Sequence, residues 1–464
     1  MERTKYNFLY IFAITLVAAL GGLLFGYDWV VIGGAKFFYE SFFGITEIAG
    51  KQALAMSSAL IGCIPGAIFS GYLNERYGRK FSLISSAFLF TFSAIGTGFS
   101  NSYGLFMFFR IAGGVGIGMA SCISPVYIAE VSPKKMRGMF VSINQLTIVI
   151  GILLAQIINY MIAEKVPDNP TNEMIFSSWN GQMGWRWMFW AETIPAFLFF
   201  MLAFFIPESP RWLAKTNKNY EVLRVLTKIG GESYAIRSEK EIRLTLQNTG
   251  KKSDVKDLLQ KNLRPVLIIA LFLAVFQQWC GINIVFNYAD EVFTSAGFGI
   301  TSSLGNIIIT GVVNLIFTVI AMTTVDRWGR RKLMLFGSWG LAIIYLILGI
   351  SYFFSMNSYI VLTIVLMAIA TYAMSLAPIT WVILSEIFPN RVRGAGMAVA
   401  SAVLWIASTF LVLLFPYIYR AVNISGAFWI YAAVCVAGYL FIRRKLPETK
   451  GKSLEEMERE LLNK

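Results

Sequence analysis

Residues 71–80 read GYLNERYGRK, and residues 322–332 read MTTVDRWGRRK. Both stretches place an acidic residue and an arginine just before a glycine and a basic run, and Arg76 and Arg327 are 327 − 76 = 251 positions apart. EVSPKKMRG at 130–138 matches EIFPNRVRG at 386–394, and PESPRWL at 207–213 loosely matches PETKGKSL at 447–454. The offsets of these pairs, 386 − 130 = 256 and 447 − 207 = 240, are similar, so we predict a duplicated unit.

The composition places this duplicated unit in a membrane. Of the 464 residues, 56% are hydrophobic and only 14% are charged, and the mean hydropathy is +0.63. Soluble proteins carry about 25% charged residues. The formal charge of +14 is confined to short clusters between apolar runs, which is typical of cytoplasmic loops and argues against a nucleic-acid partner.

The residue types also limit the chemistry. The chain has no histidine, so proton handling must fall to carboxylates. GGVGIG at 113–118 lies inside an apolar run with no preceding strand, which predicts close helix packing and not a dinucleotide loop. We find no nucleophile–base set and no metal cluster in the sequence, and we expect no enzymatic activity, no metal and no cofactor.

Twelve apolar runs are long enough to cross a bilayer, which takes about 20 residues. They begin near residues 8, 52, 82, 103, 138, 188, 264, 302, 332, 358, 394 and 424. Loops rich in Lys and Arg alternate with loops poor in both, which predicts that both termini are cytoplasmic. The first apolar run is too long for the core of a cleavable signal peptide.

We therefore expect an all-α membrane protein of two six-helix halves. The N-terminal half spans 1–206, a cytoplasmic linker with short helices spans 207–263, the C-terminal half spans 264–445 and a cytoplasmic tail spans 446–464. Two linker segments, 220–226 and 239–246, have helical spacing. Parallel repeats are typical of transporters whose substrate site lies between the halves near mid-membrane.

These motifs resemble the sugar porter family of the major facilitator superfamily. The matching segments follow the family's order over nearly the whole chain: GYLNERYGRK and its copy, PVYIAE at 125–130 with Arg137-Gly138, PESPR at 207–211, QQWCGIN at 277–283, SEIFP at 385–389 with Arg393-Gly394, and PETKG at 447–451. The resemblance implies the twelve-helix major facilitator fold and sugar transport by alternating access in the plasma (bacterial inner) membrane. The pattern is most similar to bacterial D-xylose–proton symporters and is related to facilitative glucose transporters.

The charged residues of the repeated loops are candidates for a cytoplasmic gate. Pairs of carboxylate and arginine would tie the inner ends of the halves together in an outward-facing state and break when the inner side opens. The alternative is that these charges only set the topology. The candidates are Glu75, Arg76, Arg79, Glu130, Arg137, Asp326, Arg327, Arg330, Glu386 and Arg393.

Several amides and tryptophans at membrane depth are candidates for sugar contacts. An amide offers donors and an acceptor, which suits a sugar hydroxyl, and an indole stacks on the apolar face of a sugar ring. Hydrogen bonds between helices and core packing are the alternatives. The resemblance implies that the sugar-contacting positions are Gln145, Gln277, Gln278, Asn283, Asn314, Trp381 and Trp405.

One carboxylate lies inside the first span, in GGLLFGYDWVVIGG at 21–34. A charge at bilayer depth costs at least about 2.5–3.5 kcal/mol. Counted from the span ends at about 1.5 Å per residue, Asp28 and Arg110 lie at a similar depth, and Glu192 of the sixth span lies near it. Burial favours neutral Asp28 and Arg110 favours its charged form, so a change in their separation would bind or release a proton.

The resemblance implies the same role for this position. Proton-coupled members carry an aspartate where Asp28 lies and an arginine at the Arg110 position, whereas facilitative members typically carry a neutral residue. Glu192 matches a carboxylate of coupled members and is a secondary candidate for proton transfer. A static ion pair that braces the first half is the alternative.

We expect a monomeric symporter that moves a pentose or hexose, with D-xylose as the first candidate, together with a proton. A uniporter with a structural Asp28–Arg110 pair is the main alternative, and a sugar sensor is disfavoured by the short tail. Three departures from the family lie near the expected pocket and leave the sugar open: Asn287-Tyr288 in place of two tyrosines, Ala377 before Pro378, and Leu404.

Overall fold

The computed structural model describes residues 6–167, 170–248, 255–260, 263–389 and 392–448, and within these ranges it contains helices and no strand. The first part of the chain forms α1 (Phe8–Phe42), α2 (Ala49–Arg76), α3 (Arg79–Gly98), α4 (Tyr103–Val131), α5 (Arg137–Ile162), α6 (Asn172–Ser177), the π-helix η1 (Asn180–Gly184), α7 (Trp185–Ala191) and α8 (Thr193–Ala203). The second part forms α12 (Arg264–Trp279), α13 (Ile282–Asn287), α14 (Ala289–Ser295), α15 (Ile300–Trp328), α16 (Arg330–Phe353), α17 (Ser358–Met374), α18 (Leu376–Ile387) and α19 (Arg393–Lys445).

The helices account for twelve passes through a membrane. In the part of the chain that the structure describes, ten helical stretches are long and apolar enough to cross one. The stretch Gly394–Lys445 holds two passes, because Asn423 has a non-helical backbone (φ 57°, ψ 179°) within α19. The sixth pass consists of α7 and α8, which are separate helices on either side of Glu192. The predicted starts of the other spans agree with the helices to within three residues, and the twelfth was predicted directly after the Asn423 kink.

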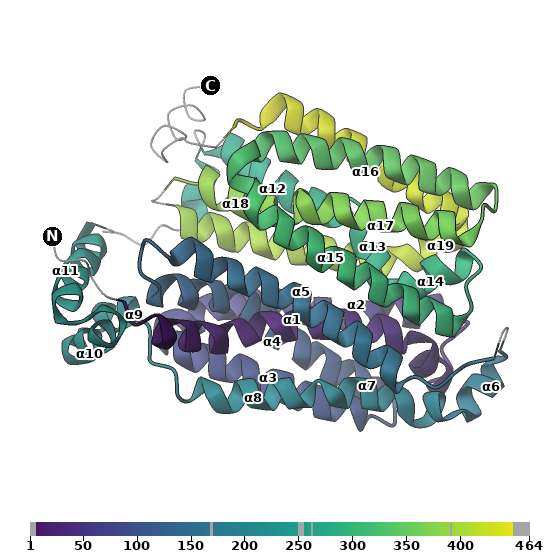
Figure 1. Ribbon diagram of the computed structural model, residues 1–464, viewed down its shortest axis with the longest axis horizontal. Helices are drawn as coiled ribbons and strands as arrows, with labels where there is room; N and C mark the ends of the chain where they lie inside the picture. The colour runs from purple at the N-terminus through teal and green to yellow at the C-terminus, as the bar shows by residue number, and fades with distance from the viewer. Residues whose placement is uncertain (1–5, 168–169, 249–254, 261–262, 390–391, 449–464) are drawn as a thin grey trace.

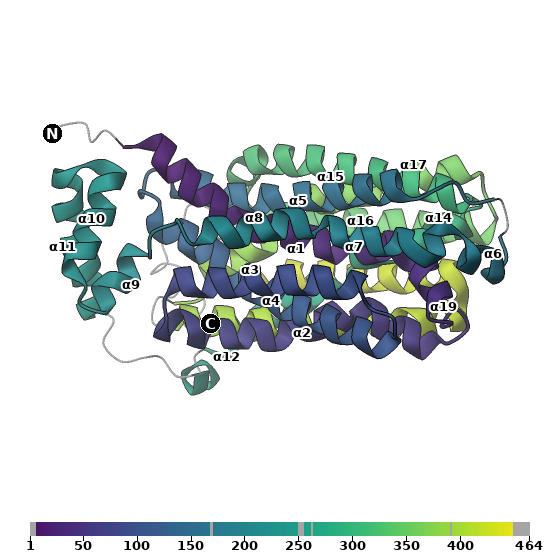
Figure 2. The same ribbon diagram turned by 90° about the horizontal axis from the view of Figure 1, so that it is seen from below.

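Two groups of helices lie side by side, α1–α8 and α12–α19 (Figure 1). The start of α1, the end of α19 and the helices α9–α11 lie at one end of the bundle, called here the terminal end, while α6 and α14 lie at the opposite or far end (Figures 1 and 2). The groups meet where α1 contacts α13 and α14, α2 contacts α19, and α5 contacts α15. The site is therefore sought between these helices.

Small residues let α2 and α4 pack closely within the first group. A Cβ atom on Gly114 would lie 2.0 Å from the carbonyl oxygen of Ala59, and one on Gly118 would lie 2.3 Å from that of Cys63. These distances are shorter than any normal contact, so only glycine fits. The interpretation of GGVGIG as a packing stripe is confirmed.

Between the two groups the chain forms α9 (Pro210–Lys215), α10 (Asn219–Gly230), α11 (Glu232–Asn248) and the short 3-10 helix η2 (Val255–Leu259). The predicted linker helices are thus present as α10 and α11. They stay attached to the first group, since the backbone N–H of Asn7 donates to the carbonyl of Ile229 at 2.9 Å. Lys134, in the α4–α5 loop, also pairs with Glu241 of α11 at 2.8 Å.

Candidate functional site

A buried ion pair lies in the middle of the first group. Asp28 of α1 and Arg110 of α4 are each 1% exposed. The Arg110 guanidinium bonds to the Asp28 carboxylate through Nη1, and its Nη2 donates to the Asp28 carbonyl at 3.2 Å. Gly113 leaves room beside the pair, because a Cβ there would lie 3.1 Å from Asp28 Oδ2. The contact predicted from equal depth is present.

Glu192 joins this pair as a second buried acid. It is 2% exposed, lies at the break between α7 and α8, and interacts electrostatically with Arg110. Within the described residues, Glu192 Oε1, Asp28 Oδ2 and Arg110 Nε make no hydrogen bond, and Arg110 lies over the Phe189 ring at 5.3 Å. Asp28 and Glu192 are thus two buried carboxylates beside the single cation of Arg110. A buried negative charge without a cation is avoided when one of the two carboxylates holds a proton.

The second group supplies a run of bonded amides on the broken span α12–α13. The break lies at Gly281, whose φ of 94° is a left-handed conformation that favours glycine. Asn283 Nδ2 donates to Gln278 Oε1 at 2.5 Å, and Gln278 Nε2 lies 3.4 Å from Gln277 Oε1. Asn287 Nδ2 donates to the Asn283 carbonyl at 2.9 Å. Discontinuous helices with free polar groups are where transporters bind substrates.

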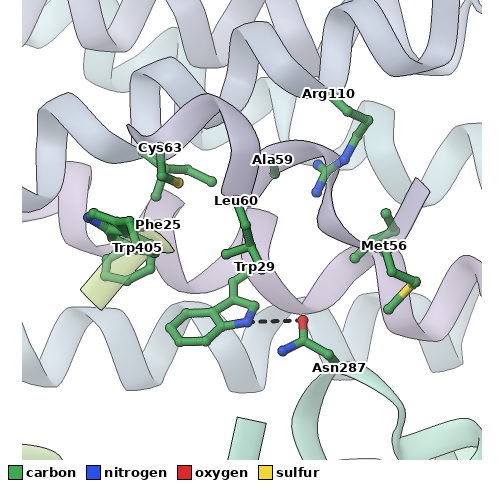
Figure 3. A pocket seen from close by; sticks show the side chains of 11 residues that line it. Phe25, Trp29, Met56, Ala59, Leu60, Cys63, Arg110, Asn287 and Trp405 are labelled. Carbon is green, nitrogen blue, oxygen red and sulfur yellow. Dashed lines mark hydrogen bonds between the residues drawn. The ribbon is translucent and has the colours of Figure 1, made fainter. Parts of the chain in front are cut away.

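A cavity lies where the two groups meet, and it touches the ion pair (Figure 3). It contains about 270 Å³ of space not filled by atoms, part of it open to solvent. The centres of water-sized molecules can occupy only about 10 Å³ of it, which is about the space of one water, so the cavity is narrow and too small for a sugar in this conformation. The first group contributes Arg110, Phe25 and Trp29 to the lining, and the second contributes Asn287 and Trp405.

Sequence reasoning missed Trp29 as a member of this site. Its indole Nε1 donates to Asn287 Oδ1 at 3.0 Å, which joins α1 to α13 (Figure 3). The Trp29 ring stacks on Phe25 with centroids 5.4 Å apart and lies 6.5 Å from the Trp405 ring. One sequence signal that could have identified Trp29 is that a large aromatic residue directly follows Asp28. A second signal is the departure from the family pattern at Asn287.

The predicted sugar-contacting residues are only partly brought together. Trp405 lines the cavity, is 2% exposed, and its Nε1 has no hydrogen-bond partner within the described residues. Asn314 is buried on α15, whereas Gln145 on α5 and Trp381 on α18 are half-buried. Of the seven predicted residues, Trp405 lines the cavity; these last three do not, and neither do Gln277, Gln278 and Asn283.

At the far end, a buried ion cluster that sequence reasoning also missed links the two groups. Lys36 of α1 is 5% exposed, lies 3.4 Å from Asp290 and pairs closely with Glu291, both on α14. Glu40 of α1 lies 4.0 Å from the Lys36 ammonium and accepts a hydrogen bond from Gln52 at 3.0 Å. A lysine inside an apolar span was the signal for this cluster.

At the terminal end, the repeated motifs form two similar ion pairs. Arg79 of α3 makes two bonds of 2.9 Å to Glu130 of α4, and Arg330 of α16 bonds to Glu386 of α18 at 3.2 Å. Each pair joins two helices of the same group. The predicted pairing of arginine with carboxylate is therefore present, but in this conformation these two pairs do not bridge the halves.

A third repeated residue supports each pair. Glu208 accepts the backbone N–H groups of Arg79 at 2.9 Å and Lys80 at 3.1 Å, at the start of α3. Glu448 accepts those of Arg330 at 2.9 Å and Arg331 at 3.2 Å, at the start of α16. Burial raises the pKa of the Glu208 carboxyl, and the N–H bonds oppose this effect. The matched geometry confirms the internal repeat at the level of single bonds.

The other gate candidates have different surroundings. Glu75 lies 3.9 Å from Lys215 of α9, Arg76 contacts Tyr72 and lies over the Tyr77 ring at 5.4 Å, and Arg137 is exposed at the start of α5. The side chains of Asp326, Arg327 and Arg393 lie outside the part of the chain that the structure describes. The tail beyond residue 448 also lies outside it.

Two solved structures match this arrangement over nearly the whole chain. The partially occluded inward-open structure of the xylose transporter XylE from E. coli is 38% identical, with a TM-score of 0.84, and covers 96% of this chain and 100% of that one. XylE bound to 6-bromo-6-deoxy-D-glucose gives a TM-score of 0.80 at 38% identity and covers 98% and 100%. The fold is that of a major facilitator transporter.

The sequence comparisons agree with the structural ones. The D-xylose-proton symporter of Escherichia coli (strain K12) is 40% identical over 98% of this chain and 96% of that protein. The glucose facilitated diffusion protein of Zymomonas mobilis is 32% identical over 96% of both. The family described as "Sugar (and other) transporter" matches residues 14–461. The chain therefore belongs to this sugar transporter family and is an integral membrane transporter.

Proposed function

We propose that this protein is a proton-coupled monosaccharide symporter, with D-xylose as the first candidate substrate. The observation that carries the proposal is the buried Asp28–Arg110 pair, which touches a cavity shared by both halves. Asp28 is the proton site, Arg110 sets its charge state, and Glu192 is a secondary proton carrier. The D-xylose-proton symporter of E. coli, at 40% identity, supports both the sugar and the coupling.

The sugar binds between the halves. The bonded amides Gln277, Gln278 and Asn283 accept and donate to its hydroxyls, and Trp405 packs against its ring. None of the predicted amides lines the narrow cavity of this conformation, nor does Trp381, so these residues, including Gln145 and Asn314, come together around the sugar when the halves move. Residues 1–206 and 264–445 are the two moving units, joined by 207–263, and residues 446–464 form the tail.

The protein works as a monomer in the lipid bilayer of the plasma (bacterial inner) membrane, with the terminal end in the cytoplasm. Two observations favour an inward-facing state. The halves are bonded to each other at the far end, and the TM-score is higher with the partially occluded inward-open structure of XylE (0.84) than with XylE bound to 6-bromo-6-deoxy-D-glucose (0.80). When the terminal end closes, Glu75, Arg76, Arg79, Glu130, Arg137, Asp326, Arg327, Arg330, Glu386 and Arg393 form the cytoplasmic gate.

Transport by purified protein in vesicles tests the proposal. A pH gradient drives wild-type protein to accumulate D-xylose, and Asp28→Asn abolishes this accumulation while exchange of labelled for unlabelled sugar continues. Glu192→Gln, which removes the second buried acid, slows accumulation without abolishing it. Normal accumulation by the Asp28→Asn variant would overturn the assignment of the proton site.

Facilitated diffusion is the second candidate, favoured by the name of the Zymomonas relative. It predicts that a pH gradient leaves the final internal sugar concentration of wild-type vesicles equal to the external one. Thermal stabilisation by D-xylose, L-arabinose and D-glucose, measured on the purified protein, identifies the substrate in either case. A larger shift with another sugar would replace D-xylose as the first candidate.

A further inference from the structure

A continuous route connects the amide run to the buried ion pair. It passes from Gln278 to Asn283, from Asn283 to Asn287, and from Asn287 across the interface to Trp29, with contacts of 2.5, 2.9 and 3.0 Å. Trp29 is the neighbour of Asp28 in the chain. The route therefore begins at residues proposed to bind sugar and ends beside the residue proposed to bind the proton.

Both the oxygen and the nitrogen of the Asn287 amide take part in this route. Its Oδ1 accepts from Trp29 of the first half, and its Nδ2 donates to the Asn283 carbonyl of the second half. Asn283 in turn gives its Nδ2 hydrogen to Gln278. A sugar hydroxyl that bonds to Gln278 or Asn283 competes with these contacts for the same oxygen and N–H groups and so shifts the amides.

The same indole lines the cavity together with Arg110 of the ion pair. The Phe25 and Trp405 rings, which contact each other, both pack against this indole (Figure 3). Movement of this ring changes how much of the cavity reaches Arg110. Hydration of the pair weakens the hold of Arg110 on Asp28, since charges interact less strongly in water.

We propose that Trp29 and Asn287 are positioning residues that link sugar occupancy in the second half to protonation of Asp28 in the first half. The inference rests on the proposed symport. Sugar binding rearranges the amides, the Trp29–Asn287 bond loosens, and Asp28 takes up its proton more readily. By linkage, protonation of Asp28 strengthens sugar binding by the same factor.

Two variants remove the bond without removing the charged pair or the sugar-binding amides. Trp29→Phe keeps an aromatic ring and loses the N–H donor, and Asn287→Leu keeps a similar volume and loses the acceptor. In each variant we expect proton-driven accumulation to fall at least about 5-fold more than sugar exchange does, which is the lower range of typical coupling between sites. The double variant resembles either single one, because both remove the same bond.

Trp279→Phe is the matched control. The Trp279 indole donates to the Ala407 carbonyl at 3.0 Å, a bond of the same kind within the second half. Its loss leaves the ratio of accumulation to exchange at the wild-type value. Equal losses of both activities in Trp29→Phe and Asn287→Leu would show a merely structural role and overturn the inference, as would additive effects in the double variant.

The outcomes separate this inference from the proposed function. When wild-type protein accumulates sugar and both interface variants keep its ratio of accumulation to exchange, the inference is wrong and symport stands. When wild-type protein never accumulates sugar against its gradient, symport is wrong and the coupling role falls with it.

Discussion

The far end and the terminal end of the molecule use charged residues in opposite ways. At the far end, Lys36 of the first half lies between Asp290 and Glu291 of the second, and the Val166 N–H donates to Thr301 Oγ1 across the same interface at 3.1 Å. At the terminal end, the Arg79 and Arg330 pairs each stay within one half. In this conformation the far end joins the halves, and the terminal pairs make each half rigid.

Removing Lys36 should have the largest effect, because it weakens the contact that joins the two halves at the far end. Lys36→Met leaves the buried Asp290 and Glu40 and the half-buried Glu291 without their cation, and loss of one partner of a buried ion pair costs about 3–5 kcal/mol. We expect the far ends to separate. Spin labels at Phe99 and Phe354, which are 65% and 68% exposed at the ends of α3 and α16, measure the distance directly.

Lys51→Met is the control for this experiment. Lys51 is an exposed lysine of α2 at the same end, over the Tyr103 ring at 5.9 Å. Its loss changes the total charge equally and should leave the label distance unchanged. A wild-type distance in Lys36→Met would mean that the ion cluster does not hold the halves together.

Packing inside one half should affect stability without moving the halves. Gly114→Ala forces a methyl group to within 2.0 Å of the Ala59 carbonyl at the α2–α4 contact, and overpacking of this kind costs about 1–3 kcal/mol. We expect a lower thermal unfolding temperature and an unchanged far-end distance. Gly104→Ala, on the same helix with open space around its Cβ, is the matched control. Equal stability of the two variants would contradict the packing account.

The smallest expected effect is the difference in stability between variants of the two terminal ion pairs. Glu130→Gln removes the charge from a carboxylate that makes two 2.9 Å bonds to Arg79, whereas Glu386 accepts one bond of 3.2 Å from Arg330. Because charged hydrogen bonds contribute about 1.5–3 kcal/mol when well formed, we expect Glu130→Gln to lower the unfolding temperature more than Glu386→Gln. The reverse order would show that the bond geometry does not set the strength of these pairs.

The parts of the structure that were predictable follow from regular helix geometry. Asp28 and Arg110 were paired by counting residues from the span ends, which works because every helix rises by the same amount per residue. The repeated motifs predicted the arginine–carboxylate pairs but not which residues pair, since the loops hold several acids and arginines. The family resemblance indicated the amide run at 277–283.

The remaining features depend on how helices meet across the two halves. The bond from Trp29 to Asn287 needs a particular approach of α1 to α13, which periodicity does not contain. The Lys36 cluster exists because the far ends are together in this conformation, and another state of the transporter would separate its members. The division into α7 and α8 at Glu192 was not predicted, although Pro195 was a signal for it, because proline cannot donate the bond to the carbonyl of Ala191, where α7 ends.

The most direct test of the central claim is the movement of protons with sugar. Wild-type protein in weakly buffered vesicles should make the external medium more alkaline when D-xylose is added, because the proposed symport carries a proton on Asp28 with each inward transport step. Asp28→Asn should take up or exchange the sugar with no such pH change. Sugar uptake by wild-type protein without alkalinisation, or an equal pH change in the Asp28→Asn variant, would contradict the account.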